Sequence, residues 1–154
     1  RVPKDRILAG NAVEWLPPVR PLFIALQCGM AIGLATRALA EAEAQGGAGR
    51  SVMAGDIAAT REQLAAEVAT LFAGLRSGSF IAKCAPLFEL RIRLAEIVTA
   101  ATTLELQTGG GRCYLREPGR AFARRWREAA FIPVITPSIV QLRTVLAGAK
   151  VAAA

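Results

Sequence analysis

The stretch that decides the fold is residues 91–138, in which an apolar helix pattern ends at Gln107-Thr108-Gly109-Gly110-Gly111. The apolar residues of this pattern recur at spacings of three and four residues: Leu87, Leu90, Leu94, Val98, Ala101 and Leu104. Such spacing places the side chains on one face of an α-helix. The three glycines predict its end, because glycine adopts the positive φ of a helix C-terminus and loses the most entropy when held helical. A glycine turn also lets another molecule approach its amide groups closely.

The composition indicates a single helical domain in a reducing compartment. The chain has 154 residues, of which 53% are hydrophobic and only 6% aromatic. This alanine-rich mixture favours helices that pack through small side chains over a sheet of β-branched residues. Histidine is absent, which removes the commonest general base and zinc ligand, and we expect no metal site. Cys28, Cys84 and Cys113 lack metal-ligand spacing and favour a reduced, cytoplasmic setting over a disulfide framework.

The apolar periodicity predicts an all-α fold, an up-and-down four-helix bundle. We expect long helices over residues 22–44, 56–75, 86–107 and 138–150, with a shorter one near 121–131. Pro17, Pro18 and Pro21 are expected to precede the first helix, and Asp56 and Ser138 to be N-caps. The core face of the second helix is predicted to carry Leu64, Val68, Leu71, Phe72 and Leu75.

The first predicted helix is apolar on nearly every face. Gln27 and Arg37 interrupt it within the length of about 20 residues that a membrane span needs, so we expect a buried core helix and no membrane. Gly29 and Gly33 predict tight packing of a neighbouring backbone. Because one core cannot cover so apolar a helix, we also expect association with another element or subunit. Residues 1–16 are interpreted as the tail of a preceding β domain or a linker, and residues 17–154 as the helical domain.

The net charge of +7 comes largely from one arginine-rich segment. It contains Arg112, Arg116, Arg120, Arg124, Arg125 and Arg127. Three interpretations are open: a solvated basic face, a site for an anionic cofactor or substrate phosphate, and a nucleic-acid surface. The last is disfavoured, because no aromatic residues interleave for stacking and no DNA-binding motif is present. We therefore expect no nucleic-acid partner.

The order of motifs resembles that of the acyl-CoA dehydrogenases, a family of FAD flavoproteins. The run from Gln107 through Gly110-Gly111 to Cys113-Tyr114 is similar to the family's Gln-x-x-Gly-Gly-x-Gly-Tyr signature, near the end of the third long helix of its C-terminal domain. Residues 125–139 resemble the family's Arg-Asp helix and Glu-Gly-Thr turn, with Thr136 at the threonine. Other matching segments are Arg91 and Glu96, Ala31-Ile32-Gly33-Leu34-Ala35, and Val2-Pro3-Lys4-Asp5-Arg6-Ile7-Leu8. Together they cover nearly the whole chain.

The resemblance implies the C-terminal helical domain of a longer flavoprotein oxidoreductase that dehydrogenates an acyl-CoA thioester, assembled as a homodimer or homotetramer. It implies that Gln107, Gly110 and Gly111 contact the ADP part of FAD bound mainly by a neighbouring subunit, and that Thr136 lies near the flavin. Arg50 stands nearest to the family's Arg-x-x-Phe flavin motif. The alternative interpretation is that these glycines only end the helix.

The catalytic residue stays unknown. In the commonest branch of the family the base is the Glu of the Glu-Gly-Thr turn, where Val134 or Ile135 stands here. In another branch it lies in the first helix, where this chain has Phe23 or Ile24, and Glu14 is a substitute only by proximity in sequence. Three functions remain open: an acyl-CoA dehydrogenase-like oxidoreductase with a displaced base, a flavin-dependent monooxygenase on the same scaffold, and a catalytically silent assembly domain. The substrate itself cannot be read from this chain.

Overall fold

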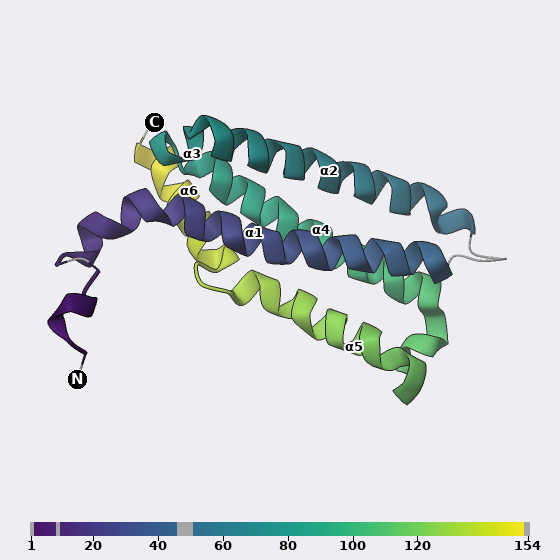
Figure 1. Ribbon diagram of the computed structural model, residues 1–154. Coiled ribbons are helices and arrows are strands. Elements are labelled where there is room, and N and C mark those ends of the chain that lie inside the picture. Colours follow the sequence, from purple (N-terminus) through teal and green to yellow (C-terminus); the bar gives the residue numbers. More distant parts are fainter. Residues whose placement is uncertain (1, 9, 46–50, 153–154) are drawn as a thin grey trace.

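The computed structural model describes residues 2–8, 10–45 and 51–152, with side chains up to residue 149. Its regular elements are the helices α1 (Ala12–Gln45), α2 (Ala54–Ser77), α3 (Ser79–Ala82), α4 (Ala85–Gly109), α5 (Arg116–Phe131) and α6 (Ile139–Ala152), shown in Figure 1. Short 3-10 turns lie at Lys4–Arg6, Ser51–Met53, Gly110–Tyr114 and Ile132–Val134. The part of the chain that the structure describes contains no strand, which confirms the all-α prediction.

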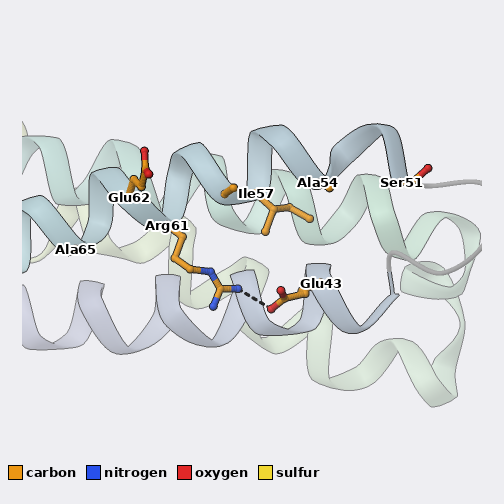
Figure 2. A pocket seen from close by; sticks show the side chains of 8 residues that line it. Glu43, Ser51, Ala54, Ile57, Arg61, Glu62 and Ala65 are labelled. Atoms are coloured by element: carbon orange, nitrogen blue, oxygen red, sulfur yellow. Dashed lines mark hydrogen bonds and ion pairs between the residues drawn. The ribbon is translucent and has the colours of Figure 1, made fainter.

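Helices α1 and α4 run through the middle of the molecule, with α2 along one side and α5 along the other (Figure 1). The most extensive contact is between α1 and α4, and both α2 and α5 contact each of them. The ion pair between Arg61 of α2 and Glu43 of α1, at 2.7 Å, spans the edge of the α1–α2 interface (Figure 2). The short helix α6 packs near the start of α4.

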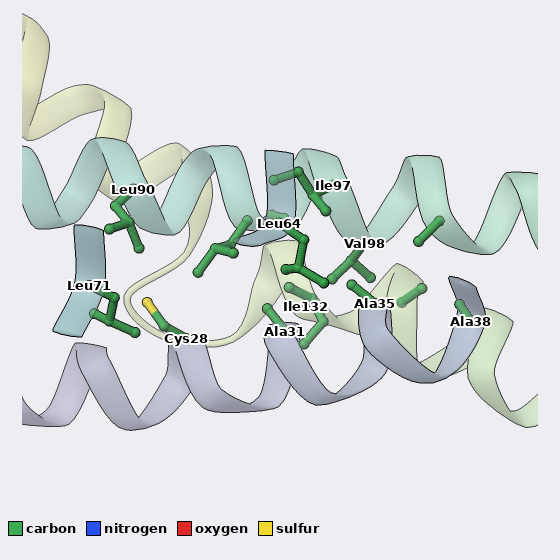
Figure 3. Packing of buried hydrophobic residues seen from close by; sticks show 14 of the residues in the cluster. Cys28, Ala31, Ala35, Ala38, Leu64, Leu71, Leu90, Ile97, Val98 and Ile132 are labelled. Atoms are coloured by element: carbon green, nitrogen blue, oxygen red, sulfur yellow. The ribbon is translucent and has the colours of Figure 1, made fainter. Parts of the chain in front are cut away.

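Small side chains explain why α1 and α4 pack so closely (Figure 3). Ala31, Ala35, Ala38 and Ala42 recur along one face of α1 and are fully buried. Alanine adds little bulk, so the helix axes approach and the larger α4 side chains fill the space between them. The whole predicted apolar stripe of α4 is buried. The expectation of helices packed through small residues is therefore confirmed at this interface.

Helix α1 begins at Ala12, so the predicted start at residue 22 is wrong. Asn11 caps it: its Oδ1 accepts from the Val13 amide at 3.0 Å, and its Nδ2 donates to Glu14 Oε1 at 2.7 Å. The three prolines at 17, 18 and 21 lie inside the helix. Each removes one backbone donor, but most of this first part of α1 is exposed, so water can satisfy the carbonyls that lose a partner. The Asn11 cap therefore determines where α1 begins, and the prolines do not prevent the helix from forming there.

The expected domain boundary after residue 16 falls within α1. Of the preceding residues that are described, Lys4–Arg6 form a 3-10 turn, where a strand end was expected. The assignment of residues 1–16 to a β domain or linker stays a prediction.

Among the other helix predictions, the one for Ser138 is confirmed, and those for Asp56 and Phe72 are wrong. Ser138 caps α6 as predicted: its Oγ accepts from the Gln141 amide at 3.3 Å, and Gln141 Oε1 accepts from its amide at 2.7 Å. Asp56 is not an N-cap, because α2 begins at Ala54 and Asp56 lies in the first turn, where a carboxylate complements the helix dipole. Phe72 was wrongly assigned to the core, since its side chain is 52% exposed.

The prediction that Gly29 and Gly33 mark tight packing is also wrong within this chain. A Cβ atom built on either glycine meets no other atom within 4 Å. Both residues lie on the exposed side of α1, with Leu22, Leu26 and Met30. The buried side of α1 carries the alanines instead, so α1 is apolar on two faces and covered on one.

Candidate functional site

The three consecutive glycines have different structural roles. Gly109 is the last residue of α4, and a Cβ there would overlap Cys113 Sγ and lie 2.7 Å from Gln45 Oε1, so close packing requires glycine. Gly110 has φ 55° and ψ −142°, a conformation open essentially to glycine alone. Neither reason for glycine applies at Gly111, because its φ is not positive and an added Cβ meets nothing within 4 Å. The interpretation as a helix stop explains the first two glycines and leaves Gly111 without a reason inside this chain.

Gln107 and Gly111 are both exposed at the C-terminal end of α4. Gln107 makes no side-chain hydrogen bond to any residue that the structure describes, so its amide has donors and acceptors available for another molecule. With the open backbone of Gly111 beside it, this end of α4 can receive a polar group that approaches the main chain closely.

Thr136 lies at the other end of α4, in the connection between α5 and α6. Two buried side chains donate hydrogen bonds to backbone carbonyl groups of this connection. Gln27 Nε2 of α1 donates to the Thr136 carbonyl at 2.6 Å, and Arg91 Nη2 of α4 donates to the Ile132 carbonyl at 2.7 Å. These contacts tie the connection to both central helices and so fix the position of Thr136.

Arg91 is a buried cation without a carboxylate partner. Its side chain is fully buried, and Nε and Nη1 have no acceptor among the described residues. Burial lowers the pKa of the Arg91 guanidinium, an effect that the nearby Cys28 opposes. Burial also raises the pKa of the Cys28 thiol to about 11, against the opposing charge of Arg91. Cys28 is therefore a neutral thiol at neutral pH and does not neutralise Arg91.

An apolar groove of about 760 Å³ opens beside Thr136, between the first part of α1 and helix α6. Its walls include Trp15, Phe23 and Leu26 of α1, Phe88 of α4, Thr136 and Pro137, and Leu142 and Val145 of α6. Among the described residues that line it, Arg20 is the only ionisable one. The groove suits an apolar ligand, and it offers no carboxylate for acid–base chemistry.

The groove and the glycine turn are separate places. Phe88 lines the groove and Gln107 lies in the last turn of α4, and 19 helical residues at 1.5 Å each put them about 28 Å apart. The sequence-predicted residues Gln107, Gly110 and Gly111 thus form one cluster, and Thr136 belongs to another. Arg50 lies outside the described residues. The cavity of about 590 Å³ in Figure 2, between α1 and α2, is lined mainly by alanines and the Arg61–Glu43 pair.

The arginine-rich segment divides into two groups. Arg125 donates from Nε to both carboxylate oxygens of the buried Glu105, at 3.1 and 2.9 Å, and Nη2 also donates to Oε1. Arg124 pairs with Glu128 at 2.7 Å. Arg116 and Arg127 have no ion pair with any described residue, and Arg120 lies 3.8 Å from Glu117. The interpretation as a uniformly solvated basic face is therefore wrong for Arg125, whose role is to hold α5 against α4.

Two segments, Ala12–Gln45 and Arg116–Ala149, are long and apolar enough to cross a membrane by length and composition alone. The second is not one helix, because α5 ends at Phe131 and α6 begins at Ile139. Half of the most apolar window of the first is buried inside the fold. The described residues contain no group of three or more His, Cys, Asp or Glu side chains that could hold a metal ion.

No protein-family model, curated protein or solved structure matches this chain in the three comparisons made with known proteins.

Proposed function

We propose that this chain is the C-terminal helical domain, of the four-helix acyl-CoA dehydrogenase type, of an FAD-dependent oxidoreductase that acts on an acyl-CoA thioester. One observation carries the proposal. The family's two alternative base positions, in the first helix and in the Glu-Gly-Thr turn, must surround the same substrate proton. Phe23 and Thr136, which stand at or beside those positions and are 113 residues apart in sequence, line the same apolar groove.

Of the two α1 residues that the resemblance leaves open for the base position, the groove supports Phe23. Phe23 lines it, whereas Ile24 is fully buried in the core. An acyl chain in the groove would contact Phe23, Leu26 and Val145, and the Thr136 turn would border its polar end.

The glycine turn fits the diphosphate part of FAD. Gly111 leaves the backbone open to close approach, and the exposed Gln107 amide can bond to the ligand from one side. When bound, the flavin would supply the hydride acceptor. The separation of about 28 Å along α4 agrees with two flavin-related contacts that belong to different subunits' sites, as the resemblance implies.

The described residues that line the groove include no carboxylate that could remove the substrate proton. Val134 is exposed but does not line the groove, and Ile135 packs against the core. Glu14 accepts a hydrogen bond from Asn11 at the start of α1 and does not line the groove either. A displaced base must therefore come from outside these residues. Two alternatives need no such base and are therefore favoured by its absence from the groove. One is a flavin-dependent monooxygenase, and the other is a catalytically silent assembly domain.

Acyl-chain binding tests the groove. Phe23→Asp is expected to weaken binding of an acyl-CoA by about tenfold or more, because it removes an apolar contact and places a charge against the chain. Phe72→Asp is the matched control, since Phe23 is 55% and Phe72 52% exposed and only Phe23 lines the groove. The measurement is calorimetric titration with a medium-chain acyl-CoA and with CoA alone. An acyl-CoA that binds no better than CoA, or equal losses in both variants, contradicts the proposal.

We also infer that the chain associates with itself through the exposed face of α1. Leu22, Leu26, Met30 and Gly33 follow one another along that face at helical spacing, and all are exposed. Apolar side chains in a continuous exposed row are typical of an interface.

Gly33→Leu is expected to reduce self-association while leaving the fold intact. The new side chain points into open space within the chain and replaces a poor helix former, so it obstructs only a neighbouring molecule. Gly55→Leu in α2, where an added Cβ also meets nothing within 4 Å, is the control. Static light scattering over a range of concentrations measures both. A wild-type chain that stays monomeric at high concentration would count against the inference.

A further inference from the structure

Three of the four clustered arginines that lack a strong partner surround one cavity at the start of α5. An open cavity of about 670 Å³ is lined by Arg116, Arg120 and Arg127, with Tyr114 and Glu117. Arg124 and Arg125, from the same segment, are paired with Glu128 and Glu105. Arg112, the sixth arginine of the segment, has no ion pair with a described residue and lies outside this cavity.

The cavity has a surplus of positive charge. Three arginines and one glutamate line it, a net of +2, and Glu117 makes only the 3.8 Å contact with Arg120. A bound anion with two or more negative charges would offset this surplus.

The backbone that shapes the cavity is closely packed. A Cβ on Gly119 would lie 2.6 Å from the Cys113 carbonyl oxygen and 2.9 Å from that of Arg112. Glycine at 119 therefore lets the first turn of α5 press against the turn Gly110–Tyr114. This contact sets Tyr114 beside the arginines of α5.

We propose that Arg116, Arg120, Arg127 and Tyr114 form a binding site for the diphosphate group of a small phosphorylated ligand. Guanidinium groups match phosphate oxygens with paired N–H donors, and the phenol of Tyr114 adds a single donor. Diphosphate carries enough negative charge to offset the surplus of the cavity. The inference does not depend on the proposed oxidoreductase function, because it requires only this chain and the free ligand.

The test is calorimetric titration of the 154-residue chain with inorganic pyrophosphate. The triple variant Arg116→Gln, Arg120→Gln, Arg127→Gln is expected to lose at least about tenfold in affinity, since each arginine contributes charge-assisted hydrogen bonds. The control triple Lys4→Gln, Arg6→Gln, Arg76→Gln has the same net charge and alters exposed residues that do not line the cavity. It is expected to bind pyrophosphate like the wild type.

Pyrophosphate is also expected to raise the thermal midpoint of the wild type and of the control, but not of the cavity variant. The single variant Arg127→Gln repeats the comparison with less change to α5. Equal losses in the two triple variants would show that pyrophosphate responds only to overall charge, and would overturn the proposal. Absence of pyrophosphate binding at millimolar concentration would do the same. So would binding of anionic vesicles or of an RNA oligonucleotide that pyrophosphate does not compete away.

Discussion

Replacing Glu105 by leucine is expected to lower the free energy of unfolding by about 3–5 kcal/mol, the usual result of removing one partner of a buried ion pair. Glu105 is fully buried near the end of α4 and accepts hydrogen bonds from both Nε and Nη2 of Arg125. The bond to Glu105 raises the pKa of the Arg125 guanidinium. Without the carboxylate, a cation whose side chain is only 12% exposed remains between α4 and α5 with no hydrogen-bonded carboxylate partner.

The double variant Glu105→Leu, Arg125→Met is expected to regain most of that loss, because an apolar pair replaces a desolvated ion pair at little cost. Glu96→Leu is the control: the Glu96–Arg143 pair joins α4 to α6 at 3.1 Å, but both side chains are 62% exposed. Its loss should stay within about 1 kcal/mol. Urea unfolding followed by circular dichroism measures all three. A Glu105→Leu variant as stable as Glu96→Leu would show that the buried pair does not hold α5 in place.

The sequence predicted helices well where apolar residues recur at helical spacing or a capping residue marks a helix end. The stripe from Leu87 to Leu104 is buried as predicted, Ser138 caps α6, and Gly78 ends α2 with φ 70°. The three prolines predict a later start for α1, whereas the Asn11–Glu14 capping pair, also present in the sequence, places its start at Ala12.

Long-range contacts could not be predicted in the same way. Arg91 lies on the buried stripe of α4 and finds its acceptor at Ile132, 41 residues later, so nothing near it in sequence indicates its burial. Glu105 and Arg125 are 20 residues apart. Within the glycine run, the packing of Cys113 and Gln45 against Gly109 and the positive φ of Gly110 distinguish these two glycines from Gly111.

Under the proposed function, Gly111→Val is expected to lower the FAD affinity of the whole protein by about tenfold or more, a loss of at least about 1.4 kcal/mol of binding free energy. A Cβ added at Gly111 meets nothing within 4 Å among the described residues, so the valine is expected to obstruct mainly a molecule that approaches the turn from outside. Gly110→Ala should behave differently. Its φ of 55° and ψ of −142° strain any other residue by about 1–3 kcal/mol, so stability falls along with binding.

Residues 1–154 alone are expected to keep no FAD through gel filtration. The glycine turn, Gln107 and Thr136 offer only a few hydrogen bonds, each worth about 0.5–1.5 kcal/mol net. Association first costs at least about 4 kcal/mol in lost freedom. Under the proposed function, the turn would therefore act only beside contacts from elsewhere in the whole protein.

The central claim is tested most directly by the visible absorbance and FAD content of the whole protein, compared among the wild type, Gly111→Val and the control Gly55→Val. Like Gly111, Gly55 has open space where a Cβ would stand, but it lies in α2. The proposal predicts stoichiometric FAD in the wild type and in Gly55→Val, and greatly reduced FAD in a folded Gly111→Val. A whole protein that takes up no FAD, or a Gly111→Val variant with undiminished FAD, would contradict it.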